Sequence, residues 1–137
     1  MACKSLIYAA NTNSTAVVAN GTLPISTVVR RRGSDVNLGG NSIVITDTGS
    51  NYYLVSVTAT FTVPVVGDVS LTLQQNGTNV TGATASTSVT TATTETRSLS
   101  FTAIIRTFNS CSIDNLTVIN SGVAATFSNI AISVEKL

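Results

Sequence analysis

The chain has 137 residues, of which 43% are hydrophobic, 5% are aromatic and only 9% are charged, and its net charge is +1. This length suits one domain, which we expect to span residues 1–137. The net charge gives no reason to expect nucleic acid as a partner. Charged residues lie far below the usual fraction of about 25%, so the surface is either covered in an assembly or simply polar and uncharged.

The N-terminal segment contains an apolar run of only five residues, Leu6 to Ala10. Such a run is too short for the core of a signal peptide or for a membrane span. We therefore expect synthesis in a bacterial cytoplasm or an equivalent compartment, and no membrane partner. Cys3 and Cys111 form either a disulfide or two small buried thiols, and synthesis without a signal peptide favours the thiols.

The first fifty residues contain short β-branched segments separated by turn signals such as Asn20-Gly21. They predict brief strands over Lys4–Tyr8, Ile25–Arg31, Val36–Leu38 and Ile43–Ile45.

A much longer strand is predicted within Asn51–Val66. From Tyr53 to Val63 every second residue is apolar, and the residues between them from Ser56 are Ser or Thr. Side chains on a strand alternate between its two faces, so this pattern gives one apolar face and one hydroxyl face. Every other segment is then expected to cover the apolar face.

The second half of the chain continues the same pattern. Alternation over Val69–Gln74 predicts a strand, and Asn76-Gly77 predicts a tight hairpin turn because both residues tolerate positive φ. The Thr- and Ser-rich stretch Thr81–Glu95 is expected to form strand ends and an exposed loop. Further strands are predicted at Ser98–Phe108, at Ile113–Ile119 with a bulge near Asp114-Asn115, and from Ile130 almost to Leu137.

These segments amount to eight to ten strands with no predicted helix. The fold class is therefore all-β, an antiparallel sandwich or barrel.

Three stretches resemble a known superfamily. Tyr52–Val57 is similar to the "GYYLVS" strand of the tumour necrosis factor and complement globular-head proteins. Leu71–Val80 resembles the hairpin "LxLxxNGxxV" of the bacterial and phage branch, and Ile130–Leu137 is similar to its final strand, which often ends in "IxKL". The resemblance covers about residues 51–137, and the first fifty residues match only loosely.

This resemblance implies a TNF-like jelly-roll sandwich that assembles as a compact homotrimer. In bacteria and phages such domains cap collagen-like stalks, coat spores, or form head and tail fibres. The chain contains no Gly-X-Y tract, so any stalk is another chain or is absent.

The sequence lacks the residues that catalysis usually requires. It has no histidine, which removes the commonest general base, nucleophile partner and metal ligand. Its six carboxylates are scattered and form no calcium loop: Asp35, Asp47, Asp68, Glu95, Asp114 and Glu135. We therefore expect no enzyme activity, no cofactor and no metal.

The tripeptide Arg30-Arg31-Arg32 is the one concentration of charge. It is either an anion or protein contact, such as a docking site for an acidic capsid surface, or a solvated strand end balanced by Asp35. On a strand the middle arginine points away from its two neighbours, so all three cannot share one contact face.

Several apolar residues fall out of phase with the predicted core faces. We expect six of them to face solvent and to form the trimer interface: Tyr52, Leu54, Ile104, Phe108, Phe127 and Ala131. Alternatively, twist of the long strands brings these residues into the ends of the core.

Two functions fit the sequence. The first is a structural virion protein that decorates a phage capsid or forms part of a head fibre, with capsid or other virion proteins as partners. The second is an adhesive module of a phage tail tip or a bacterial spore or cell surface, which binds a host glycan or protein through its loops.

Overall fold

The computed structural model describes residues 4–47, 50–90, 95–107 and 113–137. These residues form eleven strands and no helix: β1 (Leu6–Asn11), β2 (Thr15–Val17), β3 (Thr27–Arg32), β4 (Val36–Gly39), β5 (Ser42–Ile45), β6 (Tyr52–Thr62), β7 (Gly67–Gln75), β8 (Thr78–Val89), β9 (Arg97–Arg106), β10 (Asp114–Asn120) and β11 (Ala125–Lys136). The predicted all-β class is confirmed.

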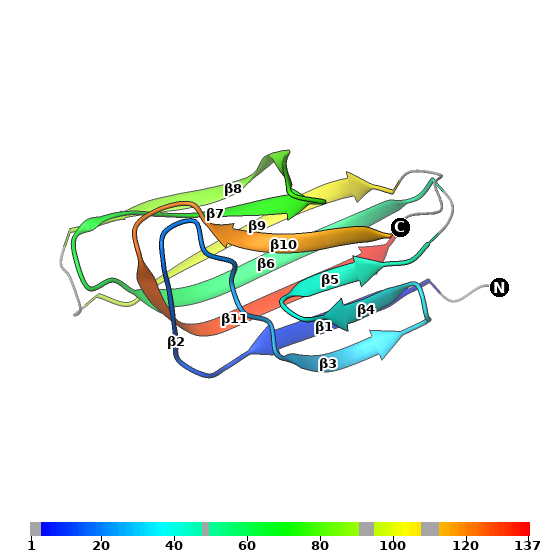
Figure 1. Ribbon diagram of the computed structural model, residues 1–137, viewed down its shortest axis with the longest axis horizontal. Helices are drawn as coiled ribbons and strands as arrows, with labels where there is room; N and C mark the ends of the chain where they lie inside the picture. The colour runs from blue at the N-terminus through cyan, green and yellow to red at the C-terminus, as the bar shows by residue number, and fades with distance from the viewer. Residues whose placement is uncertain (1–3, 48–49, 91–94, 108–112) are drawn as a thin grey trace.

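The strands form two antiparallel sheets that lie over one another (Figure 1). The six-stranded sheet has the order β3-β1-β11-β6-β9, with β2 paired to β11 beside this path. The five-stranded sheet has the order β4-β5-β10-β7-β8. Strand β6 therefore lies inside its sheet, between β11 and β9, as its long apolar face requires.

The core lies between the two sheets. The predicted apolar face of β6 is confirmed, because Tyr53, Val55, Val57, Ala59, Phe61 and Val63 are all buried. Strand β6 pairs with β9, and on the hydroxyl face Thr60 Oγ1 lies 3.0 Å from Ser98 Oγ of that strand. The facing residues of the other sheet include Leu71, Leu73, Leu116 and Val118.

The hairpin between β7 and β8 has the predicted turn. Asn76 and Gly77 adopt φ of 54° and 82°, the left-handed conformations that a two-residue hairpin turn needs. The following stretch differs from the prediction, because Thr78–Val89 is one continuous strand. Within the expected strand ends and loop of Thr81–Glu95, the strand part is longer than expected and runs to Val89, since alternating small residues on an edge strand carry no strong hydrophobic period.

The predicted bulge at Asp114-Asn115 was also wrong. Strand β10 pairs with β5 in continuous register from Asp114 to Leu116, and the buried Asp114 side chain occupies an inward position of the alternation. A polar residue on the core face, rather than an extra residue, caused the apparent slip. Register shifts occur instead in the β1–β3, β7–β8 and β6–β11 pairs.

Candidate interaction surfaces

The outer face of the six-stranded sheet carries large apolar side chains toward one end. Along one row of directly paired residues, Glu135 lies between Leu6 and Leu54, and Leu54 lies opposite Ile104. Ile104, Tyr52 and Tyr8 are 59%, 53% and 40% exposed. We call Leu6, Tyr8, Tyr52, Leu54 and Ile104 the outer-face patch.

The predicted interface residues lie in three different places. Tyr52, Leu54 and Ile104 lie in the patch, and Ala131 lies on the same face opposite Thr58. Phe108 lies outside the described residues, as do Cys3 and Cys111.

The prediction for Phe127 was wrong. Phe127 is fully buried, and its ring centroid lies 5.5 Å from that of Phe61 in the core. The register of β11 against β6 shifts between Phe127 and Asn129, which leaves Ser128 as the extra residue. The bulge puts the odd-numbered Phe127 on the same face as the even-numbered Ile130, a change of phase that strict alternation cannot anticipate.

Two patch residues, Leu6 and Tyr8, were missed by the sequence analysis. Their period of two in β1 marked them as facing the same side, but only the pairing of β1 with β11 places them beside Glu135 and Ser133. Local pattern alone therefore gave too small a patch.

A second partly apolar surface lies where β8 and β9, the edge strands of the two sheets, pack against each other. Phe101 and Ala103 of β9 and Val80 and Ala85 of β8 contact the core but are only partly buried. These four side chains are thus partly accessible along this edge.

The three arginines lie on β3 at the opposite edge of the six-stranded sheet, and all are exposed. Arg30 and Arg32 pair with Tyr8 and Leu6 on the outer face, whereas Arg31 pairs with Ile7, which is buried. The predicted alternation of the arginines is confirmed.

A polar cluster closes one end of the sandwich. The Oδ2 atom of Asp47 accepts hydrogen bonds from Asn51 Nδ2 at 2.7 Å and from the Tyr53 hydroxyl at 2.9 Å. It also lies 3.0 Å from Lys136 Nζ, which is 3.7 Å from Asp35. Burial of the phenol, together with the hydrogen bond to Asp47, raises the pKa of Tyr53.

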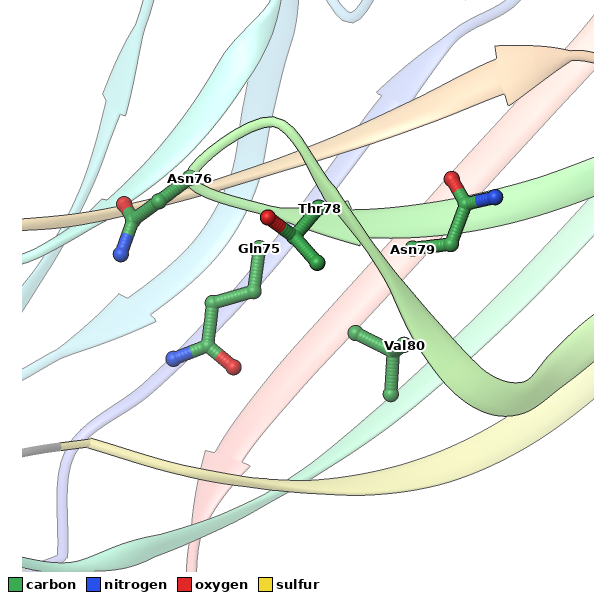
Figure 2. A pocket seen from close by; sticks show the side chains of 5 residues that line it. All are labelled: Gln75, Asn76, Thr78, Asn79 and Val80. Carbon is green, nitrogen blue, oxygen red and sulfur yellow. The ribbon is translucent and has the colours of Figure 1, made fainter.

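A depression of about 380 Å³ adjoins the β7–β8 turn and is lined by Gln75, Asn76, Thr78, Asn79 and Val80. Figure 2 shows these side chains around the turn, with Gln75 and Val80 pointing to the same side. Asn76 Nδ2 and Gln75 Nε2 donate to the buried carboxylate of Asp114 at 2.8 and 3.3 Å. The lining is therefore uncharged and held in place by hydrogen bonds.

Within the described part of the chain, no three acidic or thiol side chains gather into a group that could hold a metal ion. These residues likewise include no helix of the length and hydrophobicity needed to cross a membrane.

No family model and no curated protein matches the sequence, but solved structures share its fold. The Eiger TNF from S. frugiperda superposes with a TM-score of 0.75 at 14% identity, covering 98% of this chain and 92% of that one. The globular domain of the zebrafish complement 1qA protein gives 0.65 at 8% identity, covering 96% and 94%. The PRD1 vertex protein P5 gives 0.59 at 12% identity, covering 99% and 98%. The chain therefore has the jelly-roll fold of the tumour necrosis factor and C1q globular domains, as the resemblance of its strands implied.

Proposed function

We propose that this protein is a non-enzymatic structural component of a phage virion, a capsid decoration or head-fibre protein that acts as a compact homotrimer. The observation that carries this proposal is the outer-face patch. Exposed apolar area costs about 25 cal/mol per Å², and contiguous apolar patches on soluble proteins mark interfaces. A likeness in fold to a vertex protein supports a place on a virion.

The proposed trimer has a threefold axis, so each interface joins two different surfaces. The outer-face patch of one copy would meet the β8–β9 edge of the next, where Phe101 and Ala103 are partly exposed. Partly exposed apolar area is thus present on the complementary edge.

Light scattering of the purified protein tests this proposal. We expect a trimer for the native chain and a folded monomer for Leu54→Asp combined with Ile104→Asp. The matched control, Thr117→Asp combined with Asn41→Asp, places the same charges on β10 and in the β4–β5 turn of the other sheet and should remain trimeric. A double patch variant that stays trimeric would refute the interface.

We also propose that the protein is catalytically inert, since it has no histidine and the described carboxylates form no clustered site. Incubation with polysaccharide and peptide substrates should give no turnover. Reproducible turnover that disappears on substitution of a single Asp or Glu would contradict this.

The second candidate function is an adhesive module of a tail tip or a spore or cell surface, and the depression beside the β7–β8 turn favours it. Amide and hydroxyl groups around an uncharged hollow suit a neutral glycan, although they offer no aromatic ring for stacking. Saturation-transfer NMR with host-surface glycans tests this alternative. Asn79→Ala should abolish a saturation-transfer signal that arises in this depression. Asn41→Ala removes the same type of side chain from the β4–β5 turn and should leave the signal unchanged.

A further inference from the structure

The arginines of β3 have no acidic partner within the described part of the chain. Arg30 donates to its neighbour's carbonyl, Val29 O, and Arg32 donates to Lys4 O, each at 2.9 Å. Arg31 donates to Val36 O at 2.9 Å and to the side chain of Asn37. The described ion pairs involve Arg97 and Lys136 instead, so the three guanidinium groups keep most of their donors for an external anion.

The same strand has one unpaired side. Strand β3 ends the six-stranded sheet and pairs only with β1 among the described strands. Such an edge offers main-chain donors and acceptors to an additional strand. Three consecutive arginines would repel a second copy of β3, and they would attract a strand of opposite charge.

We propose that β3 binds an extended acidic segment of a partner protein as an added antiparallel strand. The inference rests on the proposed function, because it names the chemistry by which a capsid decoration or head-fibre protein would attach to a partner. Side chains of an added strand alternate between the two faces of the sheet. Three consecutive acidic residues would therefore meet Arg30 and Arg32 on the outer face and Arg31 on the opposite face.

This geometry explains how all three arginines can act together. A flat protein surface lying on the outer face reaches Arg30 and Arg32, but the Arg31 side chain lies on the opposite face, where it donates to Val36 and Asn37. A strand that straddles the edge can reach all three. Each arginine can bind its partner carboxylate through two parallel hydrogen bonds, since guanidinium and carboxylate groups match in shape.

Fluorescence anisotropy with two labelled, end-blocked peptides tests the inference. The first peptide, Thr-Val-Asp-Asp-Asp-Val-Thr, places acids on both faces. The second, Asp-Thr-Asp-Val-Asp-Thr-Val, has the same composition but places all acids on one face. We expect the first to bind with a dissociation constant of about 1 mM or tighter at low salt, and the second to bind several-fold more weakly, on the order of threefold to tenfold.

Variants locate the site. Arg30→Ser combined with Arg31→Ser should weaken binding by about tenfold, whereas Arg97→Ser combined with Arg106→Ser removes the same charge from the far edge and should change it by less than about twofold. Arg31→Ser alone should weaken binding as much as Arg30→Ser alone. N-methylation of the three Asp residues keeps the charge and should abolish binding, because it removes main-chain donors.

Several outcomes would overturn the inference. These are no binding of either peptide at low salt, equal binding of both peptides or of the N-methylated one, equal loss in the two double variants, or tighter binding of polyphosphate of equal charge. Light scattering of the same samples reports the trimer independently. Trimers that fail to bind would reject only the added strand, whereas a monomeric native chain would reject the proposed function.

Discussion

At the scale of single residues, Asp47 is the centre of the polar cluster, because three other side chains among the described residues make polar contacts with its carboxylate. One of its oxygens, Oδ2, accepts from Asn51 and Tyr53 and lies 3.0 Å from the Lys136 ammonium. The cluster joins the start of β6 and the end of β11 to Asp47, which follows β5, so it links the two sheets at one end. A charge at this position is stabilised by several donors rather than by a single ion pair.

We predict that Tyr53→Phe changes the stability of the protein most clearly at high pH. The pKa of Tyr53 is raised in the folded state, whereas an unfolded tyrosine ionises near pH ~10. The stabilisation from the neutral buried phenol is therefore present below about pH 10 and is lost as pH rises above it. In chemical denaturation, the native chain should lose stability above that pH more steeply than Tyr53→Phe does.

At neutral pH the same variant should be less stable by about 1 kcal/mol, the usual net value of a hydrogen bond. Tyr52→Phe is the matched control, because Tyr52 is half exposed on the outer face. Parallel pH profiles for the native chain and Tyr53→Phe would show that the buried phenol does not govern alkaline unfolding.

At the scale of elements, the bulge in β11 determines which side chains reach the core. Upstream of Ser128 the buried residues are Ala125 and Phe127, and downstream they are Ile130, Ile132 and Val134. The buried residues are odd-numbered before Ser128 and even-numbered after it. One extra residue allows this change, so that alternate side chains in both halves of the strand point into the core.

We predict that deletion of Ser128 destabilises the fold by about 3–5 kcal/mol, because it turns Phe127 outward and empties its place against Phe61. Urea unfolding measures this loss. Ser128→Ala keeps the number of residues and should change stability by less than about 0.5 kcal/mol. A deletion as mild as the substitution would mean that the strand slips without losing its core contacts.

How far the sequence predicts each element depends on how local its signal is. The period of β6 and the turn at Asn76-Gly77 are local, and both predictions were confirmed. The bulge at Ser128 follows from pairing with β6, and the continuous strand through Thr81 follows from pairing with β7. The residues of β11 do not identify β6 as its partner. The hairpin turn identifies β7 as the partner of β8, but the Thr-, Ser- and Ala-rich residues of β8 do not show how far that pairing continues, so both features escaped prediction.

At the scale of the whole molecule, the surface divides into an apolar face and an arginine edge. Sequence phase placed Tyr52, Leu54 and Ile104 on one face, but only strand order adds Leu6 and Tyr8 to them. The same strand order puts the arginines on an unpaired edge. Their charge therefore lies beside main-chain groups that an additional strand could pair with.

We predict that salt weakens binding at the arginine edge but not association through the outer-face patch. Association through the apolar patch should persist from about 0.05 M to about 1 M NaCl, since burial of apolar area does not depend on screening, whereas contacts of the exposed arginines should weaken over that range. Light scattering at both salt concentrations measures the first effect. Dissociation of the trimer at high salt would show that ion pairs hold it together.

The position of β11 also sets the order in which the protein can be completed on the ribosome. The last strand lies between β1, near the start of the chain, and β6. The N-terminal strands β1 and β3 join the rest of their sheet only through it. Until β11 leaves the exit tunnel, β1 and β6 have no partner between them. Such long-range pairing slows folding, so neither proposed interface is complete before β11 has been made and paired.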